Sequence, residues 1–114
     1  MSDNTVPEVD VDEGQARADA GALVLDVREP DEWHAGHVDG ALWIPMKEIA
    51  ARQDEVPHDR QLVVVCRSGG RSGRAVAALV QAGYDAVNLA GGMRAWQEHG
   101  FPVVGDGGEP GVVT

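Results

Sequence analysis

The chain contains a single cysteine, Cys66, and a basic loop rich in glycine follows it at once. The loop reads Cys66-Arg67-Ser68-Gly69-Gly70-Arg71, so two glycines and two arginines lie within five residues of the thiol. Glycines permit backbone turns in which successive amides point toward one centre and bind an anion. A helix beginning near Arg71 would direct its unpaired amides and positive dipole end to the same place. We therefore expect Cys66 to act as a thiolate nucleophile in an anion-binding loop.

Such surroundings lower the pKa of a thiol to about 3.5 to 7.5, from roughly 8.5 in a free cysteine. We expect Cys66 to be largely ionised at neutral pH. The alternative is an inert cysteine that packs like a small apolar residue, which the adjacent glycines and arginines disfavour. Arg67 and Arg71 are expected to attract an anion, although the sequence does not tell whether either side chain points inward. Ser68 and Ser72 are expected to add hydroxyl hydrogen bonds. The alternative for Ser72 is that it is an ordinary residue at the start of the helix.

Short apolar runs alternate with helical patterns along the chain. The predicted strands are residues 9–11, 23–26, 41–44, 62–65 and 86–89. The predicted helical segments are about 12–20 (with Asp12 as its cap), 30–36, 46–50, 71–83 and 93–100. This alternation is typical of an α/β fold with a parallel sheet and helices on both faces. The ligand site of such sheets lies beyond the carboxyl ends of the strands, where Cys66 follows the strand 62–65.

Charge and composition limit the partners and the domain organisation. The net charge of -10 disfavours nucleic acid and anionic membrane surfaces. The polar, acidic start resembles no secretory signal and no apolar run is long enough to span a membrane, so we expect a cytoplasmic protein. We expect one domain over residues 8–104, with flexible ends at 1–7 and 105–114.

The loop from Cys66 to Ser72 resembles the active-site loop of single-domain rhodaneses, the thiosulfate:cyanide sulfurtransferases. Two further signatures resemble those of the family in the same order along the chain. The first comprises Leu25-Asp26-Val27-Arg28-Glu29, Glu32-Trp33, Gly36-His37-Val38, Gly40-Ala41 and Ile44-Pro45. The second comprises Leu89-Ala90-Gly91-Gly92, Ala95-Trp96 and Gly100-Phe101-Pro102. The resemblance runs from about Val9 to Val103 and implies the rhodanese-like fold, with a central five-stranded, mostly parallel sheet.

The resemblance also implies a reaction. The loop cysteine takes the outer sulfur of thiosulfate, releases sulfite and becomes a persulfide, then passes the sulfur to cyanide or another thiophilic acceptor. No metal or organic cofactor takes part. On the matching positions, Cys66 is the nucleophile, the amides from Arg67 to Arg71 form the anion cradle, and an acceptor protein thiol is an alternative second substrate.

Two other functions remain open. Rhodanese-fold phosphatases and arsenate reductases have one more residue between the cysteine and the arginine, and the shorter spacing from Cys66 to Arg71 disfavours both. A persulfide carrier or binding module that serves a protein partner is the other alternative. Thiosulfate turnover with cyanide separates the enzyme from the carrier.

Several polar residues outside the loop have both a structural and a functional interpretation. Asp26 and Arg28 end a strand at the correct edge of the sheet, so they are candidates for a position near the site. We favour a structural role, in which Arg28 pairs with Glu32 across the turn. His34 and His37 have a spacing seen in metal sites, but no second pair of ligands accompanies them, so we predict no metal.

Overall fold

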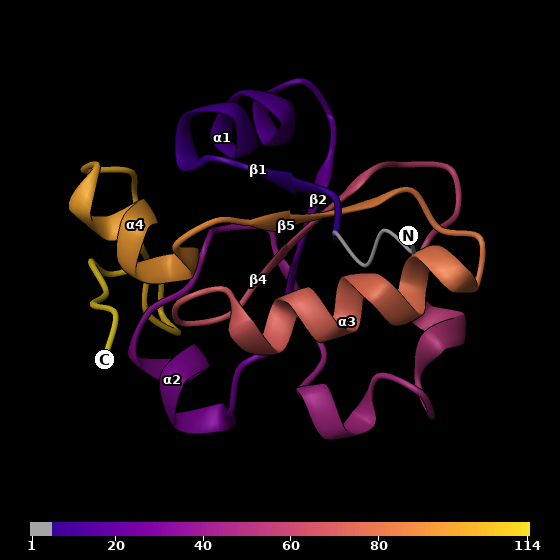
Figure 1. Cartoon of the computed structure of the whole chain (residues 1–114). Coiled ribbons are helices and arrows are strands. Elements are labelled where there is room, and N and C mark those ends of the chain that lie inside the picture. The colour runs from indigo at the N-terminus through magenta and orange to yellow at the C-terminus, as the bar shows by residue number, and fades with distance from the viewer. Residues whose placement is uncertain (1–5) are drawn as a thin grey trace.

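The structure is a computed structural model that describes residues 6–114, and its centre is a parallel sheet (Figure 1). The five strands are β1 (Glu8–Val9), β2 (Leu23–Asp26), β3 (Leu42–Trp43), β4 (Leu62–Val65) and β5 (Ala86–Leu89). They lie in the order β1-β5-β4-β2-β3, and every neighbouring pair is parallel. The predicted α/β fold is confirmed. All the strands therefore end at one edge of the sheet, and the most central strand, β4, leads directly into Cys66.

Four helices and two short 3-10 turns connect the strands. The helices are α1 (Val11–Asp19), α2 (Pro30–Ala35), α3 (Gly70–Gln81) and α4 (Gly92–Glu98); the 3-10 turns are Met46–Glu48 and Gln53–Glu55. The segment 46–50, predicted to be helical, begins as the first of these turns. The predicted strand 41–44 is shorter than expected, at Leu42–Trp43.

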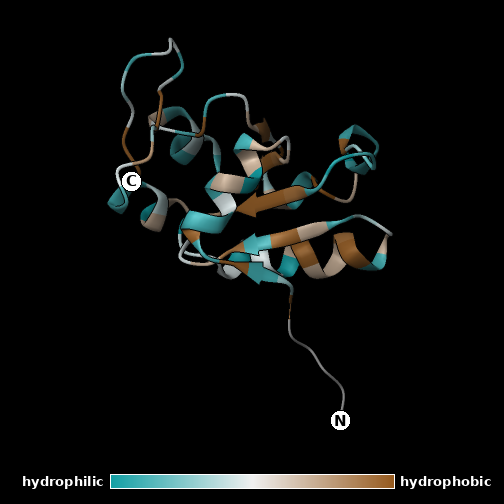
Figure 2. Ribbon diagram, turned by 90° about the horizontal axis from the view of Figure 1, so that it is seen from above, coloured by the Kyte–Doolittle hydropathy of each residue, from teal (hydrophilic) through white to brown (hydrophobic). Residues whose placement is uncertain are grey.

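Alternate residues of β4 supply two hydrophobic layers, one on each face of the sheet. Leu62 and Val64 pack in a cluster with Val76 and Leu79 of α3. Val63 and Val65 pack in a second cluster that includes Val11, which begins α1, and Met93 and Trp96 of α4. Because successive side chains of a strand point to opposite faces, a run of four apolar residues is what a strand covered on both sides requires. Brown segments of the strands in Figure 2, next to teal ones, mark the apolar residues of this centre.

The start of α1 differs from the sequence-based expectation. Val9 ends β1, and Val11 already lies in the helix and is buried, so the predicted strand 9–11 was wrong by two residues. Asp10, not Asp12, is the cap: its carboxylate accepts a hydrogen bond from the Glu13 amide at 2.8 Å. Both aspartates suit a cap, but Val11 must face the core, and this requires the helix to begin one residue after Asp10.

The carboxy-terminal segment runs beside α2. Val104 and His37 form an antiparallel bridge, and the Val112 amide donates to the Ala35 carbonyl at 3.0 Å. A Cβ on Gly36 would lie 2.4 Å from the Val112 carbonyl oxygen, so the missing side chain permits this close approach. Residues 105–114, which we expected to be flexible, thus have defined backbone partners, and their mobility remains a prediction. Most of the other expected flexible segment, residues 1–7, lies outside the described residues.

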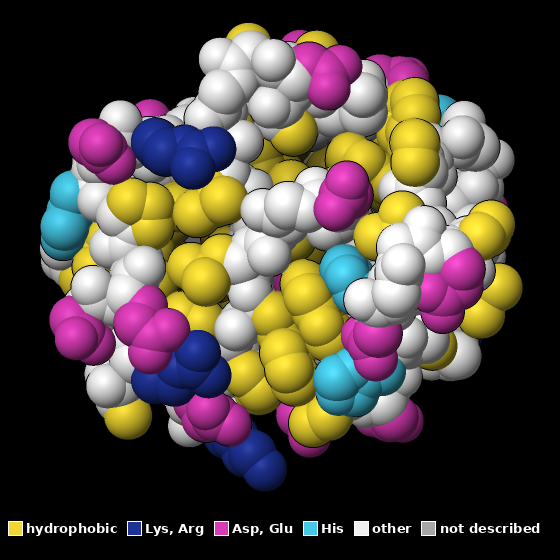
Figure 3. Space-filling model, turned by 180° about the vertical axis from the view of Figure 1, so that it is seen from behind, with side chains coloured by type: hydrophobic (Ala, Val, Ile, Leu, Met, Phe, Trp, Pro, Cys, Tyr) yellow, Lys and Arg dark blue, Asp and Glu magenta, His cyan; other side chains and the backbone are white. Residues whose placement is uncertain are grey.

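The molecular surface carries more acidic than basic side chains. Figure 3 shows the face turned away in Figure 1, where acidic groups are scattered and basic ones form a few separate patches. Among residues 6–114, no helix combines the length and apolar character needed to cross a bilayer.

Candidate active site

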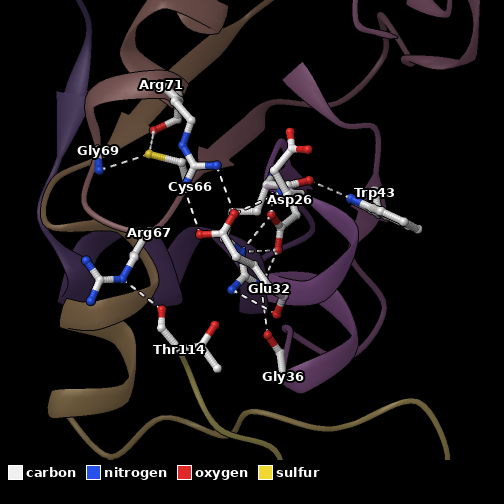
Figure 4. Close-up of polar contacts among 12 residues, drawn as sticks. Asp26, Glu32, Gly36, Trp43, Cys66, Arg67, Gly69, Arg71 and Thr114 are labelled. Carbon is white, nitrogen blue, oxygen red and sulfur yellow. Dashed lines mark hydrogen bonds and ion pairs between the residues drawn. The ribbon is translucent and has the colours of Figure 1, made fainter. Parts of the chain in front are cut away.

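The loop after β4 is the candidate site. Cys66 follows the last strand residue, Val65, and α3 begins only four residues later, at Gly70. Gly69 is the residue before the helix and has φ of 110°, a left-handed backbone conformation that side chains disfavour. This turn brings the start of α3 back toward the cysteine, whose side chain is 1% exposed (Figure 4).

Hydrogen-bond donors from the loop surround the sulfur. The Gly69 amide donates to Cys66 Sγ at 3.0 Å, and the Ser72 hydroxyl lies 3.3 Å from it. Burial raises the pKa of the Cys66 thiol, but the Ser72 hydroxyl and the amides of Ser72, Gly69 and Ser68 outweigh it, and the net effect lowers the pKa. These donors favour the thiolate because each interacts more strongly with a negative sulfur than with a neutral one. The geometry therefore supports the expected anion cradle.

Arg71 does not direct its guanidinium into the cradle. Its two Nη atoms form a bidentate ion pair with the Glu32 carboxylate of α2, at 2.8 and 2.9 Å (Figure 4). This pairing lowers the pKa of Glu32 and raises the pKa of Arg71. The arginine that we expected to attract an anion therefore has an intramolecular carboxylate as its partner, and it links the loop to α2.

Arg67 extends to a different partner. Its Nε donates to the carbonyl oxygen of Thr114 at 2.7 Å, which connects the loop with the carboxy-terminal segment (Figure 4). The side chain is exposed, as are Ser68 and Gly70. Arg67 is thus the more exposed of the two arginines of the loop.

Asp26 and Arg28 form a buried ion pair under the site. Arg28 Nε and Nη2 both donate to the Asp26 carboxylate, the latter at 2.7 Å, and neither side chain is exposed to solvent. Arg28 also donates to the backbone carbonyls of Glu32 and Gly36, at 3.3 and 2.7 Å. The predicted structural role of Arg28 agrees with these contacts, but its predicted partner was wrong: it pairs with Asp26 and not with the Glu32 carboxylate. Arg28 therefore holds the last turn of α2 through two backbone carbonyls, and α2 is the helix that presents Glu32.

The start of α4 supports the loop from a third direction. The Met93 amide donates to the Cys66 carbonyl at 2.8 Å, and the Arg94 amide donates to the Arg67 carbonyl at 3.0 Å. Gly91 and Gly92 have φ of 78° and 59°, which permits a tight turn into the last helix. The sequence signals this turn but not its contact with the backbone of the cysteine.

Asn88 is a contact of the loop that sequence reasoning missed. It lies in β5, is 4% exposed, and accepts a hydrogen bond from the Ser72 hydroxyl at 2.5 Å. The available signal was one amide side chain in the otherwise apolar strand Ala86–Leu89. Glu32 was considered as a partner of Arg28 and as part of a family signature, and its contact with Arg71 was not foreseen.

Other concave and polar features do not involve the cysteine. A hollow of about 380 Å³ lies between α1, the turn at residues 38–41, Trp96 and Pro102, and no residue of the loop lines it. Its walls carry no nucleophile, so we place the chemistry at Cys66. His37 stacks on Trp33 with 3.7 Å between ring centroids, and among residues 6–114 no three or more His, Cys, Asp or Glu residues group as metal ligands.

Comparison with known proteins assigns residues 10–99 to the rhodanese-like domain. Over 83 residues the chain is 48% identical to a protein of Allochromatium vinosum named sulfurtransferase, covering 72% of this chain and 78% of that protein. It is 43% identical to the probable adenylyltransferase/sulfurtransferase MoeZ of Mycobacterium tuberculosis, covering 69% of this chain but 21% of that one. A rhodanese-related protein from Thermoplasma volcanium has a crystal structure that superposes with a TM-score of 0.82 at 34% identity, covering 86% of this chain and 97% of that one.

Proposed function

Because the chain belongs to the family of rhodanese-like domains, we propose that it is a sulfurtransferase that uses thiosulfate and carries the sulfur on Cys66. Relatives named sulfurtransferase support sulfur transfer in general. The observation that carries the proposal is the hydrogen bonding of one buried sulfur by the Gly69 amide and the Ser72 hydroxyl. This arrangement stabilises a negative charge on sulfur, both before and after sulfur is taken up.

The first step forms a bond between sulfur atoms. The Cys66 thiolate attacks the outer sulfur of thiosulfate, and the bond between the two sulfurs of thiosulfate breaks. The electron pair of that bond leaves with sulfite, so the charge of -3 on the reactants equals that on the persulfide and sulfite together. No external oxidant or reductant is needed.

The second step regenerates the thiolate. Cyanide attacks the outer sulfur of the persulfide, and the bond to Cys66 Sγ breaks with its electron pair returning to the cysteine. The products are thiocyanate and the thiolate. The loop amides that hold the thiolate stabilise it as the leaving group of this step.

We assign attraction of the anionic donor to Arg67. Its side chain is exposed beside the cysteine, whereas the charge of Arg71 is paired with Glu32. Arg71 contributes by fixing the loop to α2. Ser68 and Gly70 provide exposed backbone next to the sulfur, and their part in binding remains a proposal.

A second candidate is a sulfur relay to a protein thiol. MoeZ is named as a probable adenylyltransferase as well as a sulfurtransferase, and it is a longer protein. The matched segment makes up only 21% of its length. A domain of this kind inside a larger chain suits delivery of persulfide sulfur to a partner. The short spacing from Cys66 to Arg71 continues to disfavour a phosphatase.

The test uses the whole chain and thiosulfate. After incubation, the intact mass of the protein should increase by one sulfur atom, and cyanide should then remove that sulfur as thiocyanate. Cys66→Ala is the control and should neither gain mass nor turn over. Equal turnover by this variant, or no sulfur adduct on the wild type, would contradict the proposal. A loaded protein that transfers poorly to cyanide but rapidly to a thiol would instead support the relay.

A further inference from the structure

Asn88 is a buried polar side chain in an apolar strand, and its contacts converge on the cysteine loop. The other residues of β5, Ala86, Val87 and Leu89, all belong to the hydrophobic clusters. Asparagine is depleted in strands, and a buried amide is unfavourable unless its hydrogen bonds are satisfied. The position therefore calls for an explanation beyond packing.

Its amide orientation follows from the groups that surround it. Asn88 Nδ2 lies 3.1 Å from the Gly69 carbonyl oxygen and 3.2 Å from a Glu8 carboxylate oxygen, and both are acceptors. Only the NH2 group can face two acceptors, so Oδ1 must face the Ser72 hydroxyl, which donates to it. The two ends of one amide thus hold two different parts of the loop.

These two parts are the ones that contact the sulfur. The amide of Gly69 donates to Cys66 Sγ, while the carbonyl of the same residue accepts from Asn88. The Ser72 hydroxyl contacts both Cys66 Sγ and Asn88 Oδ1. Gly69 also has a left-handed φ of 110°. Glycine adopts this conformation, but it also leaves it readily, because many other backbone conformations are open to glycine.

We propose that Asn88 is a positioning residue for sulfur transfer, which holds the Gly69 amide directed at the Cys66 sulfur and keeps Ser72 Oγ beside it. It does not touch the reacting atoms. It acts from β5, the strand beside β4, whose position is set by backbone pairing and not by the loop. The expected effect of Asn88 on sulfur transfer rests on the proposed function. The expected effect on the ionisation of the Cys66 thiol does not, because it requires no sulfur donor.

Two substitutions separate hydrogen bonding from packing. Asn88→Ala removes the amide and leaves a cavity, whereas Asn88→Leu keeps the branched shape and the number of side-chain heavy atoms without polar atoms. Val87→Ala is the matched control, because Val87 is the adjacent buried residue of β5 and packs in the cluster on the opposite face of the sheet. Thermal unfolding of all three variants is measured first, so that the assays are run at a temperature at which each variant is folded.

The first readout is the rate of alkylation of Cys66 by iodoacetamide as a function of pH. Both Asn88 variants should shift the midpoint upward, toward the roughly 8.5 of a free thiol, and Val87→Ala should keep the wild-type midpoint. A role in packing alone would leave Asn88→Leu at the wild-type midpoint. Unchanged midpoints in both Asn88 variants would overturn the proposal. A downward shift would do so as well, because it would mean that release of the Ser72 proton from Asn88 to the sulfur outweighs the lost hold on Gly69.

The second readout is transfer of sulfur from thiosulfate to cyanide. Both Asn88 variants should lose about tenfold to hundredfold in kcat/KM, the usual effect of removing a group that orients a reactive residue. Rates within twofold of Val87→Ala would overturn the proposal. If the wild type forms no sulfur adduct, the proposed function fails, but the alkylation result still decides whether Asn88 positions the loop.

Discussion

At the scale of single residues, Cys66 combines burial with an ionisable function. Removal from water alone would favour the neutral thiol, and the residue is only 1% exposed. Donors at 3.0 and 3.3 Å reverse this preference, so the pKa of the thiol falls. A lowered pKa means that the folded state binds fewer protons than the unfolded one between the two pKa values. The thiolate therefore stabilises the fold above the ordinary thiol pKa, and this contribution is lost as the pH falls through the lowered pKa.

Ser72→Ala should raise the pH midpoint of Cys66 alkylation. The hydroxyl that is lost lies 3.3 Å from the sulfur and can donate its one proton either to the sulfur or to Asn88 Oδ1. A full hydrogen bond to a charged group is worth about 1.5 to 3 kcal/mol and one pKa unit corresponds to about 1.4 kcal/mol, so a shared proton gives the lower end of this range. We expect an upward shift of about one unit. Ser68→Ala is the matched control for this midpoint, because the Ser68 side chain is exposed and its amide is retained. Equal midpoints in the two serine variants would show that the hydroxyl of Ser72 has no part in stabilising the thiolate.

At the scale of elements, three helices hold the loop at the end of β4. The first residues of α3 provide the Ser72 hydroxyl and the ion pair of Arg71 with α2, and the first amides of α4 bind the Cys66 and Arg67 carbonyls. The backbone carbonyls of Cys66 and Arg67 are therefore held by α4, while the thiol has its donors in the loop and at the start of α3. The closeness of α4 depends on Gly92, where a Cβ would lie 2.4 Å from the Cys66 carbonyl oxygen.

Gly92→Ala should destabilise the protein more than Gly100→Ala. Both glycines have positive φ, 59° and 77°, which costs about 1 to 2 kcal/mol for alanine. A Cβ on Gly100 meets no atom within 4 Å, so this variant reports the backbone term alone. Gly92→Ala must also displace the Cys66 carbonyl, which we expect to cost about 1 to 3 kcal/mol more and to slow sulfur transfer. The measurements are urea unfolding and thiocyanate formation; equal stability of the two variants would contradict close packing of α4 on the loop.

At the scale of the whole molecule, segments distant in the chain meet around Cys66. The Asp26–Arg28 pair anchors α2, α2 carries Glu32, and residues 103–114 return beside α2 to reach Arg67. Every buried side-chain nitrogen and oxygen in the described part of the chain has a hydrogen-bond partner. The polar groups around the site therefore form a connected framework, which favours one arrangement of the loop.

Hydrogen exchange should test whether the carboxy-terminal segment is ordered. The amides of Gly111 and Val112 donate to the carbonyls of Val103 and Ala35, at 2.8 and 3.0 Å. We expect each to exchange at least about tenfold more slowly than in an unstructured chain, because exchange requires the hydrogen bond to open. Exchange at the unstructured rate would instead support the flexible segment expected from its glycine content.

Sequence reasoning succeeded where local chemistry decides structure. The apolar run Leu62–Val65 matches a strand covered on both faces, and Gly69 matches a turn with positive φ. It was less successful at element boundaries, as at Asp10 and Asp12, where two suitable caps compete and core packing selects one. It also left the direction of the arginines open, because a long charged side chain has many rotamers and its partner depends on what packs nearby.

The sequence by itself determined which residue we propose as the nucleophile, the composition of its loop and the parallel sheet that presents it. These depend on residue type and on spacing within a few positions, which the chain carries directly. Only the tertiary structure decided that Arg71 pairs with Glu32, that α4 binds the Cys66 carbonyl and that Asn88 reaches Gly69 and Ser72. Those contacts join residues from different elements, and the order of the strands, β1-β5-β4-β2-β3, brings them together. The anion cradle predicted from Cys66 and its glycines thus owes its shape to distant parts of the chain.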